Sequence, residues 1–301
     1  MATDGGGQHP HRLHLVDGTY ELFRAHYSKR PPRTAPDGRD IKATVGLVAS
    51  LLALLDDEAE VVTHLGAAFD RPIESWRNER FPAYKSSEGV DPALLAQLED
   101  AEVAVTTLGL HVWRCERVEA DDRLAGAAVH LAPEVEQVRI LTPDKDLAQV
   151  VDGQRIVQVD RARGVVRDEA AVRERFGVAP ASIPDLLALV GDDADGIPGL
   201  PGIGAKTAAA LLGAYGTLEA VPDDPAEWTV SVRAAGRVAA TLAERREEAL
   251  LYRELTRLDT GLDPEVAIDG LAVTGVPREP YLAWCDELGL GQLRDRPRRW
   301  A

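Results

Sequence analysis

Short apolar runs alternate with longer helical patterns through the first half of the chain. The runs typical of buried strands lie at 13–16, 60–69, 111–113 and 138–141, and helical patterns at 43–55 and 92–108 separate them. A regular alternation of strand and helix is the signature of a parallel sheet with helices packed on its faces. The pattern therefore predicts an α/β fold for this part of the chain.

Several of the predicted strands end in aspartate. Asp17 follows the first strand, Asp70 ends the second, and Asp144 and Asp146 lie in the segment 142–146 that directly follows the strand at 138–141. One aspartate in such a place is more often a turn former or a helix N-cap. Because the carboxyl ends of parallel strands meet at one edge of the sheet, where ligands bind, the repetition predicts an acidic site at that edge.

The stretch 118–124 adds three carboxylates within four positions, Glu119, Asp121 and Asp122, at the start of an apolar helical pattern. Like charges this close oppose each other's ionisation, and a hard divalent cation relieves the repulsion. The alternative is that they are first-turn acids favoured by the helix dipole. The other acids at strand ends favour the metal site.

A glycine-rich run at 199–207 follows a further acidic group that contains Asp192 and Asp195. Its lysine does not follow the second glycine at the spacing of a phosphate-binding P-loop, and the run follows an acidic loop, not a strand. A dehalogenase-like phosphatase is also excluded, because the residue two positions after Asp17 is Thr19. The run instead predicts a helix-hairpin-helix turn that binds DNA phosphates through Gly202, Ile203, Gly204, Lys206 and Thr207.

The amino-acid composition limits the classes of protein to which this chain can belong. With 301 residues, of which 45% are hydrophobic and 28% charged, the chain can bury a full core. No apolar run is long enough for a membrane span and no secretory leader is evident, so we expect a cytoplasmic protein without membrane contact. Two cysteines, Cys115 and Cys285, exclude a thiolate metal site. The net charge of −16 argues against nucleic-acid binding by the overall field, so local basic clusters must supply it.

The motifs together resemble the bacterial 5′-nucleases, the family that includes the nuclease domain of DNA polymerase I, phage 5′-exonucleases and flap endonucleases. The resemblance rests on 15–18 with Arg24, on 69–70, 84–85, 119–122, 142–147 and 191–195, and it extends over 13–290. It implies a PIN-like parallel-sheet nuclease domain at 12–178, with an arch segment at 71–91, and a helix-three-turn-helix domain at 179–290. Flanking these we expect a flexible tail at 1–11 and a basic tail, which we expect to be disordered, at 291–301.

The resemblance also implies roles for individual residues. Nine carboxylates match the family's metal ligands for two Mg²⁺ or Mn²⁺ ions: Asp17, Asp70, Glu119, Asp121, Asp122, Asp144, Asp146, Asp192 and Asp195. Lys85 and Arg24 match the basic residues that hold the scissile phosphate, and Arg77 and Tyr84 of the arch are expected to contact DNA. A K⁺ ion at the hairpin is a further expected cofactor.

The implied function is a structure-selective, metal-dependent 5′-nuclease, acting as a monomer on DNA flaps, nicks and 5′ ends in replication and repair, and leaving 5′-phosphates. The alternatives left open are a non-cleaving nucleic-acid-binding protein of the same fold and a ribonuclease. The chain departs from the family at Glu88, where relatives carry an arginine that faces the threaded strand. That carboxylate should weaken the grip on a free single strand.

Overall fold

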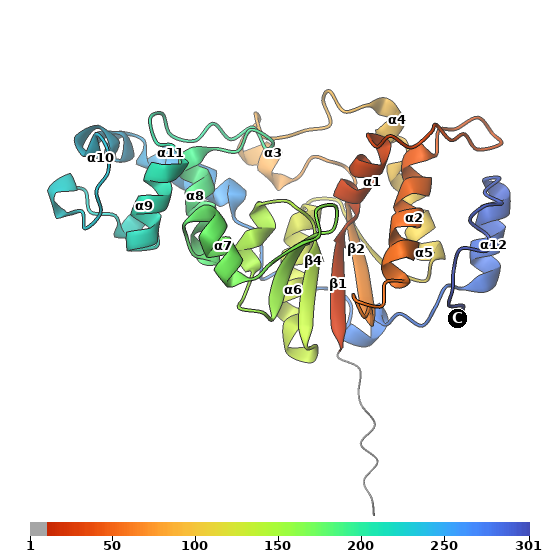
Figure 1. Ribbon diagram of the computed structural model, residues 1–301. Coiled ribbons are helices and arrows are strands. Elements are labelled where there is room, and N and C mark those ends of the chain that lie inside the picture. Colours follow the sequence, from red (N-terminus) through yellow and green to blue (C-terminus); the bar gives the residue numbers. More distant parts are fainter. Residues whose placement is uncertain (1–10) are drawn as a thin grey trace, which may run out of the picture.

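The computed structural model describes residues 11–301 and contains a mixed sheet with helices on both faces and a second group of helices at one side (Figure 1). The strands run in the order β3-β2-β1-β4-β5-β6. Their bounds are β1 Arg12–Asp17, β2 His64–Asp70, β3 His111–Cys115, β4 Gln137–Leu141, β5 Ile156–Asp160 and β6 Val165–Arg167. The first five are parallel, and β6 pairs antiparallel to β5, so the predicted α/β fold is confirmed.

The central strands end level with one another. Asp17 lies opposite Ala68 of β2, and Val16 lies opposite Leu141 of β4. The acids that follow β1, β2 and β4 are therefore delivered to a single edge. Strand order reverses between β1 and β4, which is the place where open parallel sheets bind ligands.

Helices cover both faces of the sheet, because successive side chains along each strand point to opposite faces and both sets are apolar. Leu13 and Leu15 of β1 pack with α6 (Ala120–Leu131) on one face, while Val16 packs on the other. That second face is covered by α1 (Gly18–His26), α2 (Lys42–Leu55), α4 (Pro92–Leu95) and α5 (Leu98–Thr107). The short helix α3 (Trp76–Arg80) lies in the expected arch segment.

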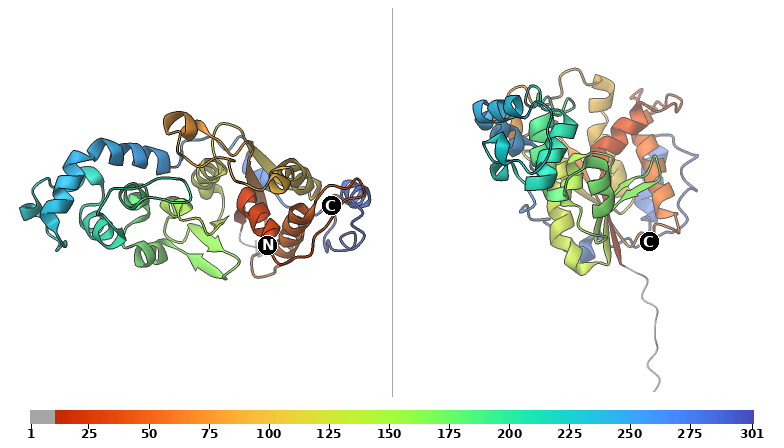
Figure 2. Two further views of the ribbon diagram at one scale, coloured as in Figure 1. Left: turned by 90° about the horizontal axis from the view of Figure 1, so that it is seen from above. Right: turned by 60° about the vertical axis from the view of Figure 1, so that its left-hand side comes forward.

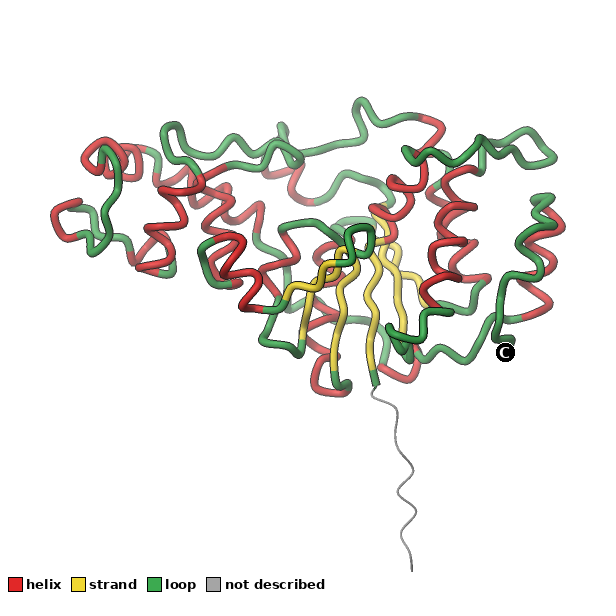
Figure 3. The backbone as a smooth tube through the Cα atoms, in the orientation of Figure 1, coloured by secondary structure: helices red, strands yellow, loops and turns green. Residues whose placement is uncertain are grey.

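The second group of helices has a core of its own, built around Leu187, Leu211 and Tyr252. Its members are α7 (Glu169–Phe176), α8 (Ile183–Val190), α9 (Ala205–Tyr215), α10 (Ala235–Glu244) and α11 (Arg246–Thr256). Figure 3 shows loops between α8 and α9 and between α9 and α10, whereas α10 and α11 are separated by Arg245 alone. Single 3₁₀ turns occur at η1 Ala132–Glu134, η2 Asp146–Val150, η3 Pro180–Ser182, η4 Leu218–Ala220, η5 Pro225–Glu227 and η6 Ile268–Leu271.

Two elements differ from their predicted bounds because a polar side chain is needed elsewhere. The strand expected from residue 60 begins at His64, since the Glu60 carboxylate turns back to pair with Arg139 at 2.8 Å and Val61 takes a left-handed backbone (φ 49°). The helix expected at 92–108 is divided into α4 and α5 at Gln97. The buried Gln97 amide accepts hydrogen bonds from the Ala43 and Thr44 N–H groups at the start of α2.

The C-terminal part of the chain differs from the expected boundary at 290 and from the expected disordered tail. After α11 the chain returns to the nuclease domain, where the Val273 N–H donates to the Thr63 carbonyl (2.9 Å). Tyr281 and Trp284 of α12 (Arg278–Glu287) are buried in the core on the α2 face, and Figure 2 shows this C-terminal segment beside the N-terminal helices. Leu293 is buried in the same core, so 291–301 is a packed segment. No helix within residues 11–301 is long and apolar enough to span a bilayer.

Candidate metal centre and DNA-contacting surfaces

The acids that follow the strands are each fixed by a backbone N–H group. Asp17 Oδ1 caps α1 by accepting from the Tyr20 N–H (2.8 Å), and Asp70 Oδ1 accepts from the Ala120 N–H (2.7 Å). Asp144 Oδ1 accepts from the Asp146 N–H (3.0 Å). Asp17 Oδ2 also accepts from Thr142 Oγ1 (3.0 Å). Capping and a place in the acidic site are compatible roles, because a carboxylate oxygen that accepts one hydrogen bond keeps a second lone pair.

Glu119 is held at the start of α6 by residues of the arch segment. Ser75 Oγ donates to Glu119 Oε1 (2.8 Å), and Lys85 Nζ lies 2.9 Å from Oε2. Tyr84 OH lies 3.3 Å from the same Oε2 and 3.2 Å from Asp195 Oδ2. Lys85 also lies 3.1 Å from Asp195 Oδ1, so the arch segment bridges carboxylates of both domains.

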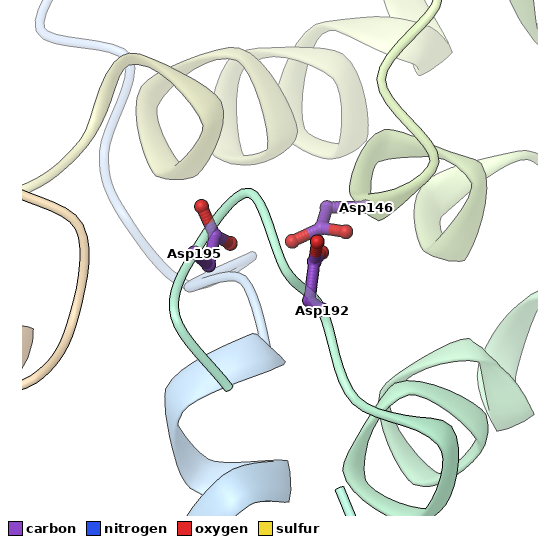
Figure 4. Close-up of side chains that lie close together, drawn as sticks. All are labelled: Asp146, Asp192 and Asp195. Atoms are coloured by element: carbon purple, nitrogen blue, oxygen red, sulfur yellow. The ribbon is translucent and has the colours of Figure 1, made fainter. Parts of the chain in front are cut away.

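A second acidic group joins the two domains directly. Asp146 is the first residue of η2, which follows β4, and Asp192 and Asp195 come from the loop after α8. One carboxylate oxygen from each of the three lies within 4.8 Å of the others (Figure 4). Lys145 Nζ pairs with Asp192 Oδ2 at 2.5 Å. The loop closes through mutual backbone hydrogen bonds between Asp192 and Ile197 (2.7 and 2.8 Å).

Glycine makes that loop possible. Gly199 has φ 66°, and a Cβ there would lie 2.4 Å from the Gly191 nitrogen. Any side chain would push the two ends of the acidic loop apart. The loop sequence therefore serves to bring Asp192 and Asp195 back over the sheet edge.

The carboxylates repel one another strongly. Burial raises the pKa of Asp17 to about 7, and the charges of Asp70 and Asp144 raise it further. Hydrogen bonds from the Tyr20 N–H and the Thr142 hydroxyl partly oppose this shift. Burial followed by the charge of Asp144 also raises the pKa of Asp121 and of Asp146. The pKa values of Asp70 and Asp144 are raised as well, with burial the largest cause.

The donor set fits hard divalent cations. All the candidate ligands are carboxylate oxygens, which Mg²⁺ and Mn²⁺ prefer. Asp146 Oδ1 is buried with no hydrogen-bond partner among residues 11–301, and a bound cation would satisfy it. The expectation of metal-ligating acids at this edge thus agrees with the chemistry of the site.

Two of the expected site residues form a buried ion pair with each other. Arg77, expected to contact DNA, is 1% exposed, and its Nη1 and Nη2 donate to both oxygens of Asp122 at 2.7 and 2.8 Å. Asp122, expected among the metal ligands, also accepts from the Glu119 and Asp259 N–H groups (3.1 and 3.0 Å). Asp122 therefore does not join the acidic cluster, and Arg77 cannot reach a nucleic acid, because each satisfies the other in the interior.

The arch tyrosine is likewise buried. Tyr84 is 4% exposed and presents its hydroxyl to Glu119 and Asp195, so its ring is not available to stack on a base. Arg24 lies on α1, where it donates to Glu21 and to Ser50 Oγ (3.0 Å). Within residues 11–301 it forms an ion pair with Glu21 and with none of the acids at the sheet edge. Glu88 is exposed.

The glycine turn is open on its outer side. Gly202 has φ 81° and no atom lies within 4 Å of where its Cβ would be. Gly204 is the N-cap of α9, and Lys206 in the first turn is exposed, whereas Thr207 is half-buried. The Ile203 side chain is buried in the second core and its N–H donates to the Leu200 carbonyl (3.2 Å), so the expected phosphate contact at this residue is not available in this arrangement. The turn can therefore offer N–H groups and one ammonium to a phosphate.

Three contributors to the site were not predicted. Lys145 pairs with Asp192, Ser75 holds Glu119, and the Asn78 amide donates to the carbonyls of Tyr84 and Lys85 (3.3 and 2.9 Å). The sequence contained a signal for the last two, because Ser75 and Asn78 have the spacing of a capping box, which α3 forms.

Family models match both parts of the chain. Residues 12–177 match the 5′-3′ exonuclease N-terminal resolvase-like domain, and residues 178–279 match the 5′-3′ exonuclease C-terminal SAM fold. DNA polymerase I of Pseudomonas aeruginosa is 37% identical over 285 residues, which are 92% of this chain and 30% of that protein. The chain thus spans less than a third of the length of this relative.

Solved structures show the same fold. The phage T5 D15 protein, co-crystallised with metal ions, superposes with a TM-score of 0.65 at 20% identity, covering 93% of this chain and 99% of that one. The catalytic core of Rad2 in complex with a DNA substrate superposes with a TM-score of 0.59 at 12% identity, covering 95% and 90%.

Proposed function

Because this chain belongs to the 5′-3′ exonuclease and flap endonuclease family, we propose that it hydrolyses DNA phosphodiester bonds at flaps, nicks and 5′ ends, leaving 5′-phosphates. The single observation that carries the proposal is the convergence of carboxylates from both domains on one sheet edge. Asp146 meets Asp192 and Asp195 there, beside acids whose pKa values are raised by burial and, to a smaller extent, by neighbouring carboxylates. Such a site is stable as a set of anions only with cations.

The proposed cofactors are two Mg²⁺ or Mn²⁺ ions. The residues that would hold the first are Asp17, Asp70, Glu119, Asp121 and Asp144; Asp192 and Asp195 would hold the second, with Asp146 between them. Ions held there supply an activated water and stabilise negative charge on the phosphate. We leave Asp122 out of this set, because its charge is already balanced by a buried ion pair with Arg77, which contacts both of its oxygens.

The remaining residues bind and orient the DNA. Lys85 lies against Glu119 and Asp195, where its ammonium can hold the scissile phosphate, and Arg24 lies on the helix that starts directly after Asp17. The open turn at Gly202 and Gly204, with Lys206, is proposed to bind duplex phosphates independently of sequence, with K⁺ as an additional ion at the turn.

The proposed working unit is a monomer, since both acidic groups and the hairpin lie on one chain. The proposed substrate also supports the expected cytoplasmic location. A ribonuclease and a non-cleaving binding protein are the competing functions, and the experiment below separates them from the proposal.

Purified protein is incubated with a 5′-labelled DNA flap, the matched single strand and an RNA flap of the same sequence, in Mg²⁺ or in EDTA. We expect Mg²⁺-dependent cleavage of the DNA flap near its junction, with a 5′-phosphate on the downstream product. Binding without cleavage would favour the non-cleaving protein, and preference for the RNA flap would favour the ribonuclease. A double variant of Asp192 and Asp195 to Asn is the matched control, and it should still bind the flap.

A further inference from the structure

Two arginines from distant parts of the chain converge on one serine. Arg24 Nη2 on α1 donates to Ser50 Oγ (3.0 Å), and Arg161 Nη1 donates to the same oxygen (3.1 Å). Arg161 Nη2 also donates to the Ser50 carbonyl (3.3 Å). Arg161 is the first residue after β5, and Figure 1 shows the turn between β5 and β6 near α1 and α2.

The group carries an excess of positive charge. Its carboxylate is Glu21, whose side chain is 3% exposed and accepts from Arg24 and from Ser50 Oγ (2.9 Å). Arg161 makes no ion pair within residues 11–301. Burial and the neighbouring Arg24 charge lower the pKa of Arg161, opposed by Glu21, so holding this cation in place costs free energy. Although the chain has a net charge of −16 and therefore many carboxylates, the Arg161 guanidinium hydrogen-bonds to Ser50 instead.

Hydrogen-bond donors remain for a ligand. Both side-chain hydrogen bonds of Arg24 within residues 11–301 use Nη2, and the side chain is 36% exposed, so the rest of the guanidinium can donate to a ligand. A guanidinium presents its donors in a planar fork that matches two phosphate oxygens. Two such forks, both hydrogen-bonded to the Ser50 hydroxyl, suit a single anionic group with several oxygens.

The group lies at the same sheet edge as the acidic cluster. α1 begins directly after Asp17, and β5 lies beside β4, where the Gln158 side chain on β5 donates to the Asp144 carbonyl. Burial raises the pKa of Tyr20; the Arg24 charge opposes this shift, and the charges of Glu21, Asp160 and Asp17 add to it. Tyr20 is therefore close enough to feel both Arg24 and Asp17 of the acidic site.

We propose that Arg161 and Arg24 together bind one backbone phosphate of the DNA, next to the phosphodiester positioned at the acidic cluster. The inference rests on the proposed nuclease function and deepens it, because it assigns a DNA-binding role to Arg161, which lies outside every motif of the resemblance. The anchoring on Ser50 orients both forks before the DNA arrives, which reduces the entropy lost on binding.

Arg161→Gln tests the proposal, and Arg163→Gln is the matched control. Arg163 lies in the same turn but is 72% exposed and pairs with Asp160 at 3.0 Å. Dissociation constants for a DNA flap are measured by fluorescence anisotropy in EDTA at several salt concentrations. Arg161→Gln should raise Kd about tenfold and reduce the salt slope by roughly 0.7 to 0.9, the contribution of one phosphate contact. Arg163→Gln should change Kd less than about twofold.

Arg161→Lys guards against a purely structural effect. A lysine keeps the charge but not the fork, so it should keep the salt slope of the parent while raising Kd about threefold. Melting temperatures are compared in parallel, and a loss of binding at an unchanged melting temperature supports the inference. An unchanged Kd and slope for Arg161→Gln, or an equal loss for Arg163→Gln, would overturn it while leaving the nuclease proposal intact. If the parent neither binds nor cleaves DNA, the proposed function fails, and the inference fails with it.

Discussion

Neighbouring aspartates on α6 should respond in opposite ways to the same substitution. Asp122→Asn removes the negative charge that both Arg77 nitrogens contact at 2.7 and 2.8 Å, and it leaves a guanidinium that is 1% exposed. Asp121→Asn removes a carboxylate whose ionisation burial, Asp144 and Asp17 oppose. In EDTA, the first change should therefore destabilise the protein, and the second should leave its stability unchanged or raise it.

The size of the first effect can be worked from the structure. Breaking a buried ion pair by removing one partner costs about 3–5 kcal/mol, because the other charge stays buried without compensation. Unfolding entropy near 60 °C is about 2.1 cal/mol/K per residue, or about 0.6 kcal/mol per kelvin for 301 residues. Asp122→Asn should thus lower the melting temperature by about 5–8 °C.

Differential scanning calorimetry in EDTA, followed by a Mg²⁺ titration, measures both changes. Asp122→Asn should need a similar Mg²⁺ concentration for half-maximal cleavage as the parent, since Asp122 lies outside the donor set, whereas Asp121→Asn should need far more. A double-mutant cycle with Arg77→Met should show that the combined loss is smaller than the sum of the single losses. A parent-like melting temperature for Asp122→Asn, together with a large rise in its Mg²⁺ requirement, would refute the reasoning and return Asp122 to the metal ligands.

Four further outcomes follow from the site and the hairpin. Because the pKa of Asp17 is raised to about 7 in the metal-free fold, protonation stabilises that fold as the pH falls through about 7; the rise in melting temperature on adding Mg²⁺ should therefore shrink between pH 8 and pH 6 in calorimetry. Lys206→Ala should weaken binding to all duplex sequences alike and reduce the salt slope by about one contact, and a sequence-dependent loss would exclude the hairpin as a backbone reader. Lys85→Ala should lower the single-turnover cleavage rate more than it weakens flap binding, and equal losses would mean that it acts only in binding. Glu88→Arg should tighten single-strand binding and steepen its salt dependence by up to about two contacts, whereas an unchanged slope would mean that Glu88 faces away from the strand.

The parts of the fold that sequence predicted are those where a pattern is local. Apolar runs identified β1, β2 and β4, and an aspartate at or shortly after the end of each run predicted the acidic site through the geometry of parallel sheets. The pairing of Arg77 with Asp122 was not local: a charged residue in a polar segment looks exposed until a partner 45 positions away is known. Tyr84 was misread for the same reason, because its hydroxyl partners come from two other elements.

The C-terminal segment shows the same limit. Its arginines dominate the composition of 291–301 and suggest a solvated tail, yet Leu293 and Trp300 pack on the core formed by α2 and α5. Two apolar residues in a short basic stretch give no periodic signal. Only the position of α12 in the structure shows that Leu293 and Trp300 pack against the apolar core on the α2 face.

That return of the chain changes what the second domain is in topological terms. The second group of helices begins near residue 168 and ends near residue 258. The chain joins the nuclease domain at both ends, so this group is an insertion with two connections to that domain. A fragment ending at residue 258 would keep every acid of the site but lose Tyr281, Trp284 and Leu293 from the core beneath α2. Truncation after residue 258, intended to isolate the nuclease domain, would therefore destabilise that domain. Any movement of the hairpin relative to the acids must change the backbone at both connections between the domains.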